Sequence, residues 1–350
     1  MSGREARWFK DVGIHLMVGF GGTALGEELK SLIRDFHIGG VVLFRRNVED
    51  PEQLQALLTD AQRFAAETMG RRLWVAIDQE GGPVQRLIPP FIQLPSARNL
   101  ATQGQDGVSE WSAKAARELH QIGIHINLAP VLDLVLEGQT HFMTERSLGS
   151  DPKRVAQLGE VWIKSLQEQG ISATAKHFPG LGRAILDPHH YAPVIQWANE
   201  AAMAEDFFPF RHAVQVGVHC VMTSHALYPY LDARWPATLS SIINRDWLRT
   251  RLEFQGLLLS DDMDMAAVSG RFTFDEVARQ GLDATLDFFL LCQQSANVEP
   301  LYRALSDAVK QEQHMAELHR RSLDRIARLT ALRNNPAAMA LSSSSVERTS

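Results

Sequence analysis

The chain alternates eight times between a short apolar run and a longer amphipathic segment. The apolar runs are too short for ordinary helices and are rich in Val, Ile, Leu and Phe, as is typical of strands buried on both faces. They occupy residues 12–20, 38–44, 72–78, 124–133, 171–178, 219–227, 256–262 and 287–292. The helix-like segments that follow them occupy residues 25–36, 51–69, 107–121, 152–169, 199–216, 241–252, 274–281 and 297–311. Strictly alternating strands and helices imply a parallel sheet, and eight such units predict a closed (β/α)8 TIM barrel.

Several boundaries of these segments carry signals of their own. Asp50-Pro51 and Asp151-Pro152 each place a capping residue before a proline at the first helical position, and Gly170 stands where a C-terminal cap glycine belongs. An open, doubly wound sheet is the alternative fold. Its usual mark is a GxGxxG turn after the first strand, and Gly19-Phe20-Gly21-Gly22 does not have that spacing.

No stretch of the sequence divides the chain into separate domains. Residues 315–334 predict a further helix packed outside the barrel, so we expect a single catalytic domain over residues 1–334. Residues 335–350 are rich in serine, and we expect this tail to be disordered.

Charge and composition exclude several classes of protein. The chain has 41 acidic and 35 basic residues, a net charge of −6, and no sustained Lys/Arg stripe, which argues against a nucleic-acid partner. No apolar run approaches the ~20 residues that a membrane span requires. The two cysteines, Cys220 and Cys292, are far apart in apolar runs, which excludes a disulfide scaffold and a cysteine-rich zinc site.

The first apolar stretch, residues 12–20, has basic residues before it and therefore imitates a short signal peptide. His15 interrupts it, however, and Gly26-Glu27-Glu28 follows where small residues should mark a cleavage site. We favour a first core strand over a signal peptide, and we expect a cytoplasmic monomer.

Polar residues gather at the C-terminal ends of the predicted strands, where the catalytic groups of such a barrel lie. The sequences at these ends are Asp78-Gln79-Glu80, Asp133, Lys176-His177, His225 and Ser260-Asp261-Asp262. One charged residue at a strand end is ordinary, but so many that converge on one rim predict a functional cluster. Lys176 is the last charge in an apolar strand, and a buried lysine needs an anion or a hydroxyl-rich partner.

Five further positions have a functional and a structural interpretation. Arg146 follows the long connection 137–145, which is a candidate binding loop, and Arg86 alone could be a surface arginine. His225 is more commonly a satisfied core histidine. Asp187 and His189 lie in a loop rich in Gly and Pro, where the carboxylate either holds the imidazole tautomer or makes a hydrated local contact.

These residues permit glycoside chemistry. A carboxylate at a strand end and a titratable group on a loop could supply a nucleophile and an acid/base, while a ring of charged donors and acceptors suits sugar hydroxyls. Of Asp261 and Asp262, we expect only one to face the barrel centre, because adjacent strand residues point to opposite faces.

Five stretches together resemble glycoside hydrolase family 3, in the bacterial β-N-acetylglucosaminidase branch of peptidoglycan recycling. They are FRRNVEDPEQL (44–54), DQEGGPVQRL (78–87), KHFPG (176–180) with DPHHYAP (187–193), MTSHALYP (222–229) and FQGLLLSDDMDM (254–265). They follow the family's order and spacing over about residues 12–335.

The resemblance implies a barrel enzyme that removes terminal β-linked N-acetylglucosamine with retention, through a glycosyl-enzyme and without a metal or organic cofactor. It makes Asp261 the nucleophile, His189 the acid/base and Asp187 the partner of His189. It places sugar-binding positions on Asp78, Arg86, Arg146, Lys176 and His177.

The sequence departs from the family pattern at four places. Leu181 stands where a histidine is usual, Pro188 where a serine separates the Asp and His, and Pro83 where an arginine follows the glycine pair. The motif of the seventh strand continues as Met263-Asp264-Met265 without the acidic residue that is common just beyond it. Leu181 and Pro188 both belong to the acid/base loop, so its geometry and its preferred leaving group stay open.

Other functions stay open as well. A metal-dependent barrel hydrolase would need clustered ligands, and the thirteen histidines form no HxH or HExxH motif. The remaining alternatives are a hexosaminidase acting on chito-oligosaccharides, a glycoside phosphorylase using the same site, and a sugar-binding barrel that has lost activity. The expected partner is in each case a small-molecule sugar.

Overall fold

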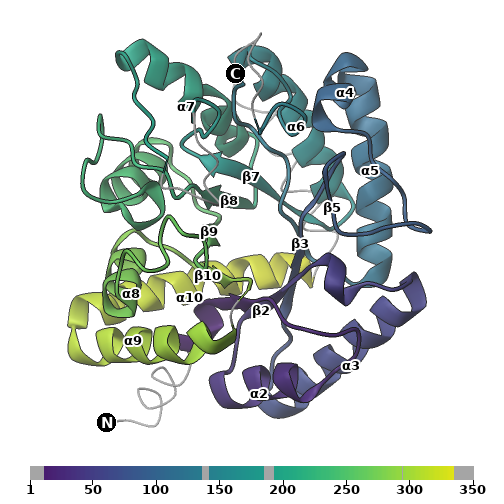
Figure 1. Cartoon of the computed structure of the whole chain (residues 1–350), viewed down its shortest axis with the longest axis vertical. Helices are drawn as coiled ribbons and strands as arrows, with labels where there is room; N and C mark the ends of the chain where they lie inside the picture. The colour runs from purple at the N-terminus through teal and green to yellow at the C-terminus, as the bar shows by residue number, and fades with distance from the viewer. Residues whose placement is uncertain (1–11, 136–141, 185–192, 294, 335–350) are drawn as a thin grey trace.

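A closed barrel of parallel strands forms the centre of the molecule (Figure 1). The computed structural model describes residues 12–135, 142–184, 193–293 and 295–334. The strand order around the barrel is β1-β10-β9-β8-β7-β6-β3-β2, so every neighbouring pair is parallel. The strands are β1 (Leu16–Val18), β2 (Gly40–Leu43), β3 (Trp74–Ile77), β6 (Ile126–Asn127), β7 (Ser172–Phe178), β8 (Cys220–Thr223), β9 (Leu257–Asp262) and β10 (Phe288–Leu291). Each lies within one of the eight predicted runs, which confirms the predicted TIM barrel.

Helices surround the barrel in Figure 1 and follow the predicted segments closely. They are α2 (Glu27–Phe36), α3 (Pro51–Met69), α5 (Gly104–Ile122), α6 (Pro152–Glu168), α7 (Glu200–Gln215), α8 (Phe274–Asp283), α9 (Val298–Gln311) and α10 (Gln313–Arg333). Asp50 and Asp151 cap α3 and α6 as predicted, because their side chains accept the backbone N–H of Gln53 and Arg154. The segment predicted as a helix over 241–252 is the π-helical η4 (Ile242–Arg251), and the short α4 (Ala97–Thr102) was not predicted.

Alternation along each strand separates two layers of apolar packing. On β3, Trp74 and Ala76 pack inside the barrel, whereas Val75 and Ile77 pack against the helices. The same alternation places Leu257 and Leu259 of β9 in the interior layer. The chain therefore fills the barrel with side chains, and polar groups enter only where a strand ends.

A hairpin of β4 (Gln79–Gly81) and β5 (Val84–Gln85) follows β3 directly, in a region that we had predicted only as a strand end. Its turn needs glycine, since Gly81 has a φ of +98° and a Cβ there would lie 2.2 Å from the Pro95 carbonyl oxygen. The hairpin folds Arg86 back beside Asp78, with which it forms an ion pair.

The N-terminal end of the barrel is closed by α10, whose Ile326 and Leu329 join the interior layer. A buried carboxylate, Asp287, fastens this helix, because Arg325 Nε and Ser322 Oγ donate to it at 2.9 and 2.5 Å. Arg249 Nη2 from η4 donates to the same carboxylate at 2.8 Å. The C-terminal helix is thus part of the barrel's closure.

The stretch that imitates a signal peptide is part of the barrel core. β1 pairs with both β2 and β10, and His15 is fully buried, with its Nδ1 2.9 Å from the carbonyl oxygen of Asp287.

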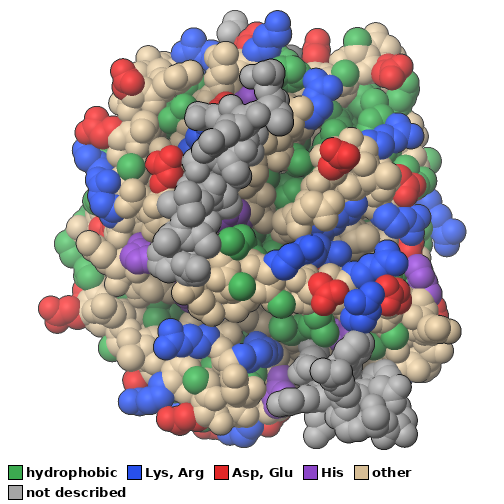
Figure 2. Space-filling view, turned by 180° about the vertical axis from the view of Figure 1, so that it is seen from behind, with side chains coloured by type: hydrophobic (Ala, Val, Ile, Leu, Met, Phe, Trp, Pro, Cys, Tyr) green, Lys and Arg blue, Asp and Glu red, His purple; other side chains and the backbone are tan. Residues whose placement is uncertain are grey.

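Figure 2 shows the face opposite to that of Figure 1, where basic and acidic side chains are interspersed. Within the described ranges, no helix has the length and apolar character that crossing a bilayer would require.

Candidate active site

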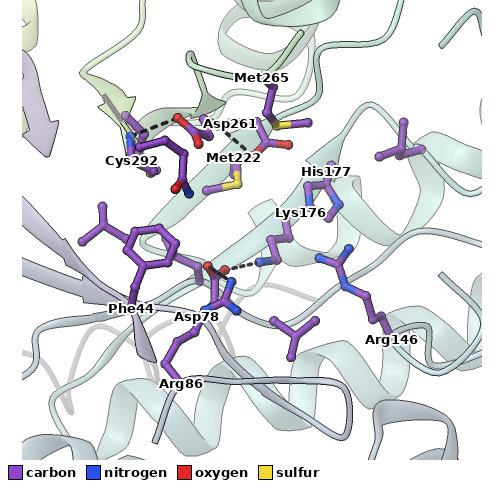
Figure 3. Close-up of a pocket in the computed structure, with 17 residues that line it drawn as sticks. Phe44, Asp78, Arg86, Arg146, Lys176, His177, Met222, Asp261, Met265 and Cys292 are labelled. Carbon is purple, nitrogen blue, oxygen red and sulfur yellow. Dashed lines mark hydrogen bonds and ion pairs between the residues drawn. The ribbon is translucent and has the colours of Figure 1, made fainter. Parts of the chain in front are cut away.

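A cavity of about 180 Å³ opens at the C-terminal ends of the strands (Figure 3). Its floor is apolar, and its walls carry the charged side chains that the sequence analysis singled out. The floor includes Val42, Leu128, Met222 and Leu290, each from a different strand or strand end. The structure brings together all five predicted sugar-binding residues and the predicted nucleophile in this cavity: Asp78, Arg86, Arg146, Lys176, His177 and Asp261.

A chain of ion pairs joins one side of the cavity. Lys176 Nζ lies 2.8 Å from Asp78 Oδ1 and 2.7 Å from Glu80 Oε1. Arg86 Nη2 donates to the other oxygen of Asp78 at 3.1 Å, and Arg146 donates to Glu80 through Nε and Nη2, both at 2.8 Å. The three cations therefore hold two carboxylates in fixed positions, which preorganises donors and acceptors for a polyol ligand.

The effect of burial on the pKa values of these groups is opposed by the charges of their neighbours. Burial raises the pKa of Glu80, but Arg146 and Lys176 outweigh it and bring the pKa down to about 2. Asp78 behaves in the same way, since Lys176 and Arg86 hold its pKa far below the ordinary value. Burial lowers the pKa of Lys176, but the two carboxylates raise it above its ordinary value. All five groups are charged at neutral pH, with one excess positive charge.

A third buried carboxylate orients His177. Asp133 is fully buried and lies 2.7 Å from Nδ1 of His177. It also accepts the backbone N–H of His177 at 3.2 Å and that of Leu181 at 2.6 Å. With Nδ1 turned to Asp133, the ring presents Nε2 on its other side, and His177 lines the cavity.

Asp261 continues the inward-facing set of β9, as the alternation with Leu257 and Leu259 requires. Burial raises the pKa of Asp261, but the neighbouring His177 ring and the Asp262 N–H, 2.8 Å from Oδ1, contribute to a net lowering. The carboxylate is therefore ionised at neutral pH, which a nucleophile requires.

Asp262 also lines the cavity, so the expectation that only one of the two aspartates would face it is wrong. The register between β9 and β10 shifts here, and Asp262 Oδ1 accepts the backbone N–H groups of Cys292 at 3.0 Å and Asp264 at 3.1 Å. Burial raises the pKa of Asp262 to about 7. The two adjacent carboxyl groups consequently differ in charge near neutral pH.

Two other side chains have clear structural roles. His225 is a satisfied core histidine, since its Nδ1 lies 2.8 Å from Thr238 Oγ1 and its Nε2 lies 2.9 Å from the Asp262 carbonyl oxygen. Phe44 forms part of the cavity wall, and the guanidinium of Arg86 lies 5.3 Å from its ring centroid.

The predicted acid/base pair, Asp187 and His189, lies outside the described residues, as does Pro188. The residues on either side of that stretch converge on one carboxylate. Arg183 Nε donates to both oxygens of Asp206, at 3.0 and 2.9 Å, and Trp197 Nε1 donates to Oδ2 at 2.6 Å. Leu181, one of the departures from the family pattern, is buried and lines the cavity.

Two residues of this site were not assigned a role from the sequence. Glu80 is the central carboxylate of the ion-pair chain, and Asp133 orients His177. The spacing of Asp78 and Glu80 is a signal that could have identified the first, because strand residues two apart share a face. Nothing in the sequence connects Asp133 with His177, which lies 44 positions later.

The arrangement offers an ionised carboxylate on one side of a small cavity and a fixed array of hydrogen-bonding groups on the other. Figure 3 shows this division, with Asp261, Met222 and Cys292 opposite Asp78, Arg86 and Arg146. Such a site can bind a sugar and attack it from one face. Among the described residues, no three or more His, Cys, Asp or Glu side chains are grouped to hold a metal ion.

Comparison with known proteins gives consistent results. Residues 12–329 match the glycosyl hydrolase family 3 N-terminal domain. A β-hexosaminidase of Alkalilimnicola ehrlichii is 35% identical over 299 residues, which cover 83% of this chain and 84% of that protein. The structure of a glycoside hydrolase family 3 β-N-acetylglucosaminidase from Paenibacillus superposes with a TM-score of 0.87 at 33% identity; the match covers 93% of this chain and 62% of that one. NagZ from Neisseria gonorrhoeae, in complex with N-trifluoroacetyl-D-glucosamine, superposes with a TM-score of 0.75 at 29% identity over 88% of this chain and 96% of that one.

Proposed function

This chain belongs to glycosyl hydrolase family 3 as a β-N-acetylhexosaminidase, and from this premise we propose that it removes terminal β-linked N-acetylglucosamine from peptidoglycan-derived muropeptides with retention of configuration. The observation that carries the proposal is the ionised Asp261 in a small cavity, facing a ring of sugar-binding groups. The complex of the Neisseria relative with a trifluoroacetylated glucosamine supports the N-acetyl sugar as the ligand.

In the proposed first step, an oxygen of Asp261 attacks the anomeric carbon, and the bond to the leaving oxygen breaks as His189 gives that oxygen a proton. Asp78, Lys176 and Arg146 hold the sugar hydroxyls while this happens. In the second step, His189 takes a proton from water, and the water oxygen displaces Asp261 from the anomeric carbon. Two displacements on the same carbon give retention.

A histidine in place of the second carboxylate suits this cavity. Asp261 carries the negative charge of the nucleophile, so a second carboxylate close to it would be repelled and would have a raised pKa. A histidine can donate a proton near neutral pH without that penalty. Asp187 would orient it, two residues earlier in the same loop.

The test compares leaving groups. A nitrophenolate leaves without a proton, whereas a sugar alcohol needs one, so His189→Ala should impair a disaccharide far more than a nitrophenyl N-acetylglucosaminide. The variant should also accumulate a glycosyl-enzyme with the activated substrate, seen as a mass increase on the peptide that contains Asp261. Asp187→Asn should show a milder version of both effects. Equal losses on both substrates, with no trapped intermediate, would remove His189 from this role and make His190 the next candidate.

Two substitutions at the end of β9 serve as the matched pair. Asp261→Asn keeps the shape of the side chain but cannot form the ester, so turnover should fall by more than about 10⁴-fold. Asp262→Asn should cost much less, because its carboxyl group is held by two backbone N–H groups and is not the attacking group. If the two variants changed places, the assignment of the nucleophile would be wrong.

The products decide among the alternative functions. Hydrolysis yields free N-acetylglucosamine as the β-anomer first, whereas a phosphorylase in phosphate buffer yields the sugar 1-phosphate. Faster turnover of a chito-oligosaccharide than of a muropeptide would replace the proposed substrate. We also propose a monomer in the cytoplasm, a compartment that the two free, buried cysteines fit, and light scattering and cell fractionation test these points.

A further inference from the structure

A second cavity lies at the opposite end of the barrel from Asp261. It has a volume of about 520 Å³ and is lined by Arg71, Arg72 and Trp74 from the start of β3 and by Thr330, Arg333 and Asn334 from the end of α10. Trp74 is the first residue of β3, and Asp78 follows the last. The strand therefore separates this cavity from the active site.

Two of its arginines have no acidic partner in the part of the chain that the structure describes. Arg333 donates to the carbonyl oxygen of Leu73 at 3.4 Å, and its guanidinium lies 4.4 Å from the centroid of the Trp74 ring. Burial and the neighbouring Arg72 both lower the pKa of Arg333, to about 10, and no carboxylate opposes them. A half-buried guanidinium next to a second one, with no counter-charge among the described residues, is electrostatically costly unless an anion enters.

Of two neighbouring side chains, Trp74 offers a hydrogen-bond donor and His125 indicates the same positive potential. Trp74 is 3% exposed, and its indole N–H donates to none of the described residues although the side chain lines the cavity. His125, whose ring lies 5.9 Å from that of Trp74, has its pKa lowered to about 3 by burial and by Arg333 and Arg72. Its Nδ1 accepts the backbone N–H of Val75 at 3.1 Å, so the ring is neutral. In the described part of the chain, the cavity thus combines two cations that pair with no carboxylate and an indole N–H that donates to no residue.

We infer that this cavity binds a phosphate-bearing small molecule, held between Arg72 and Arg333 with the Trp74 indole N–H as a further donor. Guanidinium groups match phosphate oxygens in pairs, and the volume is within the range of small-molecule sites. The ligand would neutralise the arginine pair and connect the start of β3 with the end of α10. The expected consequence of binding is a more stable barrel, since a ligand that binds only the folded state raises its stability.

The test titrates the full-length protein with pyrophosphate in a calorimeter at constant ionic strength, with glucose 6-phosphate as a second probe. We expect binding of one pyrophosphate per chain and a raised Tm, and weakening of binding by about 10-fold or more in both Arg72→Gln and Arg333→Gln. Arg321→Gln is the matched control, because it removes the same charge from an exposed position on α10 that pairs with Glu317. It should bind as the wild type does.

Three results would overturn the inference. The first is no binding of either probe to the wild-type protein, and the second is unchanged binding in Arg72→Gln and Arg333→Gln. The third is pyrophosphate acting as a competitive inhibitor of aryl-glycoside cleavage, since the anion would then occupy the active-site cavity instead. Binding by pyrophosphate but not by glucose 6-phosphate supports the site and restricts its ligands to polyphosphates.

Discussion

Glu80 is the carboxylate on which the ion-pair chain of the active site depends, and its removal is the sharpest test of that network. Its side chain is 2% exposed and accepts two hydrogen bonds from Arg146, besides its 2.7 Å ion pair with Lys176. Glu80→Gln keeps the shape but removes the charge. The amide also places an N–H₂ group where one of the cations now donates.

The loss of unfolding free energy in Glu80→Gln can be worked out in two ways. A carboxyl pKa that falls from 4.5 to about 2 on folding corresponds to ~3 kcal/mol of stability at neutral pH, since each pKa unit is worth about 1.4 kcal/mol. Breaking a buried ion pair by removing one partner costs about 3–5 kcal/mol. Both routes predict that Glu80→Gln lowers the free energy of unfolding by ~3 kcal/mol at pH 7.

The stabilisation that Glu80 contributes should depend on pH in one direction. Because the folded-state pKa lies below the unfolded one, the stabilisation from Glu80 is complete above about pH 4.5 and is lost as the pH falls towards 2. Urea unfolding of the wild type and the variant should therefore show a difference that is constant from pH 6 to 8 and begins to shrink as the pH falls below 4.5. Glu110→Gln, which breaks an exposed pair with Lys114, should leave the free energy of unfolding almost unchanged.

Kinetics provides the second measurement for this variant. Arg146 and Lys176 lose the acceptor that fixes them, so KM for an aryl N-acetylglucosaminide should rise even at temperatures where the variant is fully folded. Wild-type stability together with a wild-type KM would refute the reasoning. Loss of stability with unchanged kinetics would show that Glu80 supports the fold without positioning the sugar-binding cations.

Three other buried charges give predictions of the same kind. Asp133→Asn should cost about 1–3 kcal/mol of unfolding free energy and lower kcat/KM, because an amide cannot accept all the N–H groups around His177; wild-type kinetics would contradict this role. Asp287→Asn should lower the free energy of unfolding by about 3–5 kcal/mol, because it leaves Arg249 and Arg325 without their buried carboxylate. The kcat of the folded protein should change little, since both arginines lie far from the cavity, and a change confined to kcat would be contrary to expectation. Lys176→Met should both destabilise the protein and raise KM, measured by thermal unfolding and initial rates, and an unchanged Tm would mean that its carboxylates find other partners.

The sequence predicted the barrel because its signals are local and repeat eight times. Each strand is a short apolar run, and the helices begin at caps such as Asp50 and Asp151 that depend only on the next few residues. The hairpin β4–β5 was missed because its residues are polar. Gln79 is buried with its backbone paired to the Asn127 side chain and its Oε1 accepting the N–H groups of Arg86 and Leu87, while its Nε2 has no partner among the described residues. Burial of a polar strand depends on such partners and cannot be deduced from its own composition.

The site could be predicted as a set of residues but not as a network. Strand ends converge in any such barrel, so Asp78, Lys176 and Asp261 were expected on one rim. That Glu80 would hold Lys176 and Arg146 together depends on residues 96 and 66 positions away. The alternation rule failed at Asp262 for a similar reason, since the register shift between β9 and β10 is a property of the pair of strands.

The pairing of β1 with β10 affects how the chain is made in a cell. Leu16 and Phe289 are direct neighbours in the sheet but are separated by 273 positions in the sequence. At about 5–20 residues per second, a ribosome needs roughly a quarter of a minute to a minute between synthesising the first and the last strand. Through that time β1 has one open edge, and each newly emerged strand has another, so the nascent sheet exposes unpaired N–H and C=O groups. Closure by β10 and the docking of α10 come only after nearly all of the barrel has been synthesised, so the sheet edges of the unfinished chain stay unpaired until then.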